Sequence, residues 1–190
     1  MIDAELQQVL EETGAVLKGH FLLSSGRHSD VYVEKFRAIE RPEVLSRLCA
    51  KIAEAFRGEI DVVAGPTTGG IIIAFEVARQ LGCQALYVES ENGFKKLRRG
   101  GSVAAGARVL VVDDVLTMGT SVMEVVHLLR DYEVDLRGVA VLIDRSESPL
   151  DFGARFYAAH RVEATSYPAD AVPDWLAAIP ITKPGTRTSA

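Results

Sequence analysis

The sequence VLVVDDVLTMGTSVMEVV, residues 109–126, carries the strongest structural signal in this chain. It begins as a short apolar run typical of a buried strand, and the run ends in two adjacent carboxylates, Asp113 and Asp114. A loop of small and hydroxylated residues follows, and a helix is predicted from Ser121 to Asp131. A strand, a polar loop and a helix in direct succession indicate one unit of a parallel α/β sheet, in which ligands bind beyond the carboxyl ends of the strands.

The same alternation of apolar runs and helical segments extends on both sides of this unit. Buried strands are predicted at residues 60–64, 85–88, 108–112, 139–143 and 156–159, and further helices at 42–56 and 71–81. The pattern predicts an α/β fold, a Rossmann-like parallel sheet flanked by helices on both faces. We expect a single domain over residues 1–190, in which residues 1–40 form a small N-terminal hood and residues 181–190 a loose tail.

Composition excludes several classes of function. The net charge of −5 is unsuited to a nucleic-acid surface, which needs clustered cations. No apolar run approaches the ~20 residues that cross a bilayer, so no membrane partner is expected. The two cysteines suggest a reducing, cytoplasmic location rather than a disulfide, and the scattered histidines give no metal-ligand spacing.

The loop after the acid pair has the composition of a phosphate site. Its main-chain N–H groups and those of the helix start can hold a phosphate, and Gly119 permits close approach. Two carboxylates would repel a bare phosphate, so we expect them to accept hydrogen bonds from vicinal hydroxyls of a phosphorylated ribose, at a solvent-facing edge. An ordinary acidic loop, the alternative, would need only one aspartate. The predicted cradle comprises Asp113, Asp114, Val115, Leu116, Thr117, Met118, Gly119, Thr120 and Ser121.

Residues 109–121 resemble the 5-phosphoribosyl 1-diphosphate (PRPP) motif of type I phosphoribosyltransferases. Within that family the chain is most similar to the members that act on orotate. Three segments carry this similarity: FLLSSGRHSDVYVEK (21–35), GPTTGGI (65–71) and Ile143-Asp144-Arg145. The resemblance implies transfer of ribose 5-phosphate from PRPP to orotate, giving orotidine 5′-monophosphate and diphosphate in pyrimidine (UMP) biosynthesis. It also implies that Mg²⁺ arrives bound to PRPP, with few direct protein ligands.

The resemblance assigns further binding residues. The loop with Thr67, Thr68 and Gly69 is expected to hold the diphosphate, although its composition also suits a plain strand-to-helix turn. Arg145 offers a planar fork suited to the orotate carboxylate, the alternative being a surface pair with Asp144.

Two more side chains are candidates for contact with the base. Thr117 stands at the matching family position for a second contact to the base. Tyr32 is a candidate for stacking on the base and equally for ordinary strand packing.

Residues 89–101, ESENGFKKLRRGG, place four cations, Lys95, Lys96, Arg98 and Arg99, in a segment without an apolar pattern. The segment suits either a solvated hairpin or a mobile lid. In the family a lid lysine reaches the neighbouring subunit's site, which implies a homodimer. Glu89-Ser90-Glu91 departs from the family's R-K-x-x-K-x-H-G string, so the string does not assign the role of the lid lysine to any one of these four cations. Lys95 and Lys96 are the candidates, alongside the acid pair, for the catalytic residues.

Two rival functions share the cradle. A phosphoribosyltransferase for a purine or another base would have no use for Arg145 as a carboxylate partner. A non-catalytic PRPP-sensing regulator would often need a nucleic-acid surface, against which the acidic balance argues.

Overall fold

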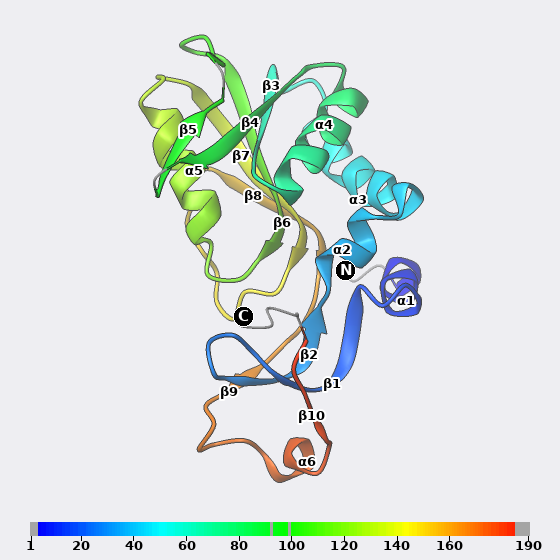
Figure 1. Cartoon of the computed structure of the whole chain (residues 1–190). Helices are drawn as coiled ribbons and strands as arrows, with labels where there is room; N and C mark the ends of the chain where they lie inside the picture. The colour runs from blue at the N-terminus through cyan, green and yellow to red at the C-terminus, as the bar shows by residue number, and fades with distance from the viewer. Residues whose placement is uncertain (1–3, 92, 99, 185–190) are drawn as a thin grey trace.

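The computed structural model describes residues 4–91, 93–98 and 100–184, which form two sheets (Figure 1). The larger sheet has the order β5-β4-β3-β6-β7-β8. Its strands are β3 Val62–Pro66, β4 Gln84–Glu91, β5 Phe94–Leu97, β6 Arg108–Leu116, β7 Asp135–Asp144 and β8 Arg155–Arg161. The five strands β3, β4, β6, β7 and β8 are parallel, which confirms the predicted fold class. β5 runs antiparallel to β4 at the sheet edge.

Helices cover both faces of this sheet (Figure 1). They are α3 Pro42–Ala55 and α4 Gly69–Leu81 on one face, and α5 Thr120–Arg130 on the other. Alternate residues of β6 divide between the two layers because successive side chains of a strand point to opposite faces. Leu110 and Val112 pack with α3 and α4, whereas Val109 and Val111 pack with α5. The apolar run that predicted the strand is therefore buried from both sides.

A second sheet, here called the hood sheet, has the order β10-β1-β2-β9 and lies beyond the carboxyl ends of the parallel strands (Figure 1). Its strands are β1 Val16–Leu22, β2 His28–Val33, β9 Ser166–Tyr167 and β10 Ile181–Thr182. Three short helices accompany it: α1 Ala4–Glu12, α2 Lys35–Ile39 and α6 Asp174–Ala177. The C-terminal segment thus returns to pair with the N-terminal hairpin, and residues 181–182, expected in a loose tail, pair with β1. Residues 185–190 of that predicted tail lie outside the described residues.

β6 is longer than its apolar run predicts. The sequence suggested a strand over residues 108–112, but β6 continues to Leu116 because β7 remains paired with it as far as Asp144. β3 pairs with β6 only between Val109 and Val111. The acid pair therefore lies near the end of β6, where β7 still pairs with the strand on one side and β3 no longer pairs with it on the other.

Within the described part of the chain, no helix combines the length and the apolar character needed to cross a bilayer. Cys49 is buried and Cys83 is half-buried, and neither forms a disulfide.

The packing of α3 on the sheet depends on a glycine. A Cβ on Gly138 of β7 would lie 2.5 Å from Cε1 of the buried Phe56 ring and 2.9 Å from the Arg155 carbonyl oxygen. We predict that Gly138→Ala lowers the free energy of unfolding by about 1–3 kcal/mol, because the ring and β8 have to move. Urea denaturation monitored by circular dichroism measures it, and an unchanged midpoint would show that Phe56 has free space.

Candidate active site

The two carboxylates of the acid pair point to opposite faces of the sheet. Asp113 lies on the α5 side, where it meets Ser121, and Asp114 lies on the α4 side, beside Gly69. Both are nearly buried, with 8% of Asp113 and 6% of Asp114 exposed. The prediction of a solvent-facing pair is therefore wrong, because β6 extends past the pair and the hood and α2 lie over its end.

Asp113 is electrostatically strained. Burial, and then the charge of neighbouring Asp114, raise its pKa to about 6. Three contacts oppose this rise: the Asp114 main-chain N–H, which donates to Oδ1 at 2.8 Å, the charge of Lys35, and the Ser121 hydroxyl. A carboxyl with a pKa in this range changes its protonation near neutral pH, so its ability to accept hydrogen bonds depends on its surroundings.

Asp114 is enclosed by backbone and by one cation. The Val115 N–H donates to its Oδ1 at 2.7 Å, and Lys35 Nζ lies 2.7 Å from its Oδ2. A Cβ on Gly69 would lie 2.2 Å from Oδ2, so the carboxylate occupies the space that a side chain would need there. The start of α4 is thus open to Asp114 because residue 69 is glycine.

A hollow of about 170 Å³ lies on the Asp113 side of the sheet. It is lined by Asp113 and by the predicted loop residues Val115, Leu116, Thr117, Met118, Gly119, Thr120 and Ser121, together with Val122. Gly119 adopts a φ of +75°, and a Cβ there would meet Leu150 at 2.8 Å. The first N–H groups of α5 have no partner within the helix, and they face a hollow that can take a phosphate.

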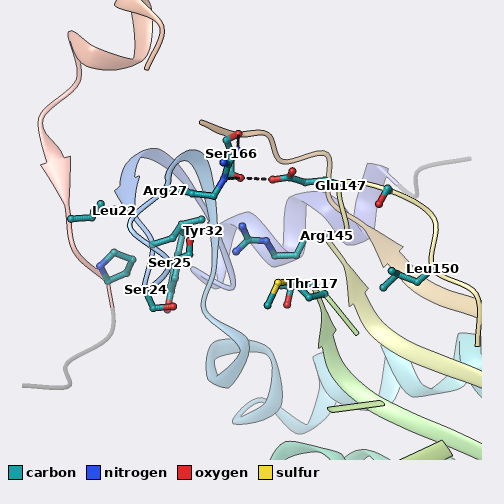
Figure 2. Close-up of a pocket in the computed structure, with 14 residues that line it drawn as sticks. Leu22, Ser24, Ser25, Arg27, Tyr32, Thr117, Arg145, Glu147, Leu150 and Ser166 are labelled. Atoms are coloured by element: carbon teal, nitrogen blue, oxygen red, sulfur yellow. Dashed lines mark hydrogen bonds between the residues drawn. The ribbon is translucent and has the colours of Figure 1, made fainter. Parts of the chain in front are cut away.

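A larger cavity of about 570 Å³ adjoins this hollow through Thr117 and Met118. Figure 2 shows the Arg145 side chain lying in it between Tyr32 of β2 and Thr117. The Arg145 Nε is buried and has no hydrogen-bond partner among the described residues, and burial lowers the pKa of this guanidinium. The structure therefore brings together the three predicted base-contacting residues. Tyr32 also packs on Phe21, with ring centroids 5.7 Å apart, so it takes part in packing within the hood sheet and also lines the cavity, where contact with a base stays a prediction.

The cavity has a second polar wall that the sequence did not suggest. Arg27 donates from Nε to the Ser166 hydroxyl at 2.6 Å and from Nη2 to the Ser166 carbonyl at 2.5 Å, and that hydroxyl donates to Glu147 (Figure 2). These contacts join the β1–β2 turn, β9 and the loop after β7. Arg27 stands in the S-G-R-x-S segment, which the family resemblance had already marked. No motif marks Ser166, because it reaches the cavity only through the pairing of β9 with β2.

The other predicted site residues lie outside both hollows. Thr67 and Thr68 precede α4 on the Asp114 side, and the Thr67 N–H donates to the Val88 carbonyl at 2.9 Å. Lys95 and Lys96 belong to β5 in a β4–β5 hairpin, at the far edge of the sheet. Lys95 Nζ lies 3.0 Å from Ser90 Oγ and 3.5 Å from Glu124, and Lys96 pairs with Glu91 at 2.6 Å.

The hairpin thus holds its own cations within this chain. Arg98 pairs with Glu89, while Arg99 and Asn92 lie outside the described residues. In residues 4–91, 93–98 and 100–184, no three His, Cys, Asp or Glu side chains gather in a way that could hold a metal ion.

Residues 38–159 match the model of the phosphoribosyl transferase domain. The fold and the cradle after β6 therefore define a phosphoribosyltransferase. The chain is 43% identical over 181 residues to the orotate phosphoribosyltransferase of Caldanaerobacter subterraneus subsp. tengcongensis, covering 95% of each chain. It is 44% identical over 184 residues to that of Pelotomaculum thermopropionicum, covering 96% of this chain and 97% of the relative.

A solved structure agrees with these sequence relatives. The crystal structure of orotate phosphoribosyltransferase from Aeropyrum pernix superimposes with a TM-score of 0.72 at 31% identity, over 83% of this chain and 93% of that one. The chain belongs to the orotate phosphoribosyltransferase family.

The strain on Asp113 predicts a stability effect with a definite sign. Because its pKa is raised in the folded state, the folded protein holds the proton more tightly than the unfolded chain, and stability falls as the pH rises from about 4 through 6. Asp113→Asn should therefore raise the free energy of unfolding by on the order of 2 kcal/mol near pH 8, and by far less near pH 4. Denaturant titrations at the two pH values measure this, and a variant less stable than wild type near pH 8 would contradict it.

Proposed function

We propose that this protein transfers the 5-phosphoribosyl group from PRPP to orotate, giving orotidine 5′-monophosphate and diphosphate in pyrimidine synthesis. The observation that carries the choice of base is Arg145, which lines the cavity next to the cradle and whose buried Nε has no hydrogen-bond partner among the described residues. A buried N–H donor without a partner is costly, and a planar carboxylate could bind the half-buried guanidinium with two parallel hydrogen bonds. The names of the relatives support the same base.

The two adjoining hollows suit the two halves of the product. The ribose 5-phosphate would bind with its phosphate on the N–H groups of residues 117–121 and its hydroxyls toward the acid pair. The base would lie in the larger cavity, with its carboxylate on Arg145, a contact to Thr117 and its ring against Tyr32. Thr117 and Met118 line both hollows, so the reacting nitrogen and the sugar carbon C1 would meet there.

The proposed reaction breaks the bond between C1 and the diphosphate oxygen and forms a bond from C1 to the base nitrogen. Its transition state has oxocarbenium character, as in glycosyl transfer generally, and needs little covalent help from the protein. The work of the site is to hold the two reactants in line and to exclude water under the hood sheet.

Mg²⁺ bound to PRPP would neutralise the departing diphosphate. The site suits a metal that arrives with its substrate and takes few ligands from the protein, because Asp113 and Asp114 already accept hydrogen bonds from main-chain N–H groups. Thr67, Thr68 and Gly69 at the start of α4 would face the diphosphate from the Asp114 side.

We also propose a lid role for the β4–β5 hairpin, a homodimer and a cytoplasmic location. Lys95 and Lys96 lie away from both hollows of their own chain, which supports a role in the site of a second copy within a homodimer. A cytoplasmic location also remains a proposal, supported by the family and by the unpaired cysteines.

The direct test is a spectrophotometric assay of orotate consumption with PRPP and Mg²⁺. We expect consumption of orotate with one diphosphate released for each molecule consumed. Activity with purines and none with orotate would make the choice of base wrong. PRPP binding without diphosphate release with any base would favour the regulator.

Arg145 should control the choice of base. We predict that Arg145→Gln lowers kcat/KM for orotate roughly 10- to 100-fold, because the carboxylate loses a charge-assisted pair of hydrogen bonds. The KM for PRPP should change little. Arg137→Gln is the matched control, since this arginine lies on β7, the strand that ends just before Arg145, in an exposed pair with Asp135 at 2.9 Å. Equal losses in both variants would remove Arg145 from base recognition.

A further inference from the structure

Lys35 connects the hood sheet to the acid pair. It is the first residue of α2 and follows the end of β2 at Val33 by two positions, while Tyr32 of the same segment lines the base cavity. The short segment 32–35 therefore supplies one wall of the base cavity and one cation to the end of β6. Lys35 is the last residue of the segment 21–35 that resembles the family, but that resemblance gave it no role at the acid pair.

The ion pair between Lys35 and Asp114 is close, and its two side chains differ in how far they are exposed to solvent. Nζ lies 2.7 Å from Oδ2, with 41% of the Lys35 side chain exposed and 8% of the Asp114 side chain exposed. The ammonium group thus reaches from the surface down to a buried carboxylate. Gly69 leaves the space for Oδ2 on that side of the sheet.

The charges around the acid pair explain why a cation is needed there. Asp113 and Asp114 are consecutive, and burial, followed by the charge of Asp114, raises the pKa of Asp113. A protonated Asp113 would donate one hydrogen bond and would lose acceptor capacity for a ribose hydroxyl. The positive charge of Lys35 instead lowers the pKa of Asp113.

We propose that Lys35 is a positioning residue of the phosphoribosyl transfer. Its ammonium group fixes the Asp114 carboxylate and offsets its charge, so that Asp113 beside it accepts a hydrogen bond from the ribose. This role rests on the proposed function. It also means that the segment bearing Tyr32 and Lys35 contributes both to the base cavity and to the charge balance of the acid pair.

The groups that face the acid pair come from four elements. α2 contributes Lys35, the start of α5 contributes the Ser121 hydroxyl, and the start of α4 contributes the backbone at Gly69. β7 pairs Val141 with Asp113, and its Asp144, opposite Leu116, is engaged by Arg161. Among these described groups, Lys35 is therefore the cation whose replacement by a neutral residue directly changes the charge beside the acid pair.

The test compares the pH dependence of kcat/KM for PRPP, which reports groups of the free enzyme, among wild type, Lys35→Met, Lys35→Gln and Lys35→Arg. Removing the charge of Lys35 should move the acidic limb of the kcat/KM profile to higher pH by roughly 0.5 to 1 pH unit in the Met and Gln variants. The Arg variant should keep the wild-type limb. Comparing variants at each pH cancels the ionisation of PRPP itself.

Arg37→Met is the matched control. Arg37 lies in the same helix and forms a surface pair with Glu40 at 2.9 Å, so its loss should leave both rate and limb unchanged. A merely structural role for Lys35 would lower the rate of the Met and Gln variants without moving the limb, and that result would overturn the proposal.

Two further measurements separate the possible failures. Thermal melts by circular dichroism identify a variant that does not fold, and the Met and Gln variants give two independent neutral substitutions. If wild type transfers nothing to orotate, the proposed function fails, and the same variants are compared by calorimetric PRPP binding near pH 6 and pH 8. Neutral variants that lose no more affinity at the lower pH than wild type would then contradict the role of Lys35.

Discussion

Two adjacent carboxylates at the end of β6 are the constraint on which the site is built. Because they are consecutive in a strand, Asp113 faces the phosphate hollow on the α5 side and Asp114 faces the start of α4. Burying two like charges side by side is unfavourable, and it is tolerated here because main-chain N–H groups, the Ser121 hydroxyl and Lys35 surround them. The glycines at 69 and 119 follow from the same constraint, since each leaves room that a side chain would fill. A site that binds a charged, hydroxylated sugar is thereby prepared at the expense of fold stability.

In the proposed function, the hood sheet adds a site for the base to the sugar site. The pairing of β1 with β10 and of β2 with β9 brings the N-terminal hairpin and the two strands that follow β8 together beyond the carboxyl edge of the parallel sheet (Figure 1). The cavity beneath it is closed on one side by the contacts among Arg27, Ser166 and Glu147, and it contains Arg145 (Figure 2). The Nε of this half-buried guanidinium is buried and has no hydrogen-bond partner among the described residues, and the orotate carboxylate would provide one. The proposed sites for the base and for the sugar are in this way two adjoining hollows that share Thr117 and Met118.

The parallel sheet and the cradle could be predicted from the sequence because their signals are local. Short apolar runs define the strands, and the acid pair with the loop to Ser121 is contiguous in the chain. The burial of the acid pair could not be predicted, since it depends on β7 staying paired to the end of β6 and on α2 lying over it. Ser166 and Lys35 were missed for a similar reason: only the return of the C-terminal segment and the turn out of β2 bring them to the site. Arg145 was found through family resemblance, and its lack of a partner became apparent only in three dimensions.

The most direct measurement of the central claim is a crystal structure of the wild-type protein with PRPP and Mg²⁺ in the absence of orotate. The account predicts that the 5-phosphate lies on the main-chain N–H groups of residues 117–121, with ribose hydroxyls within hydrogen-bond distance of Asp113 and Asp114. The cavity around Arg145 should remain open to the base. A 5-phosphate bound elsewhere, with the acid pair making no contact to the sugar, would contradict the account.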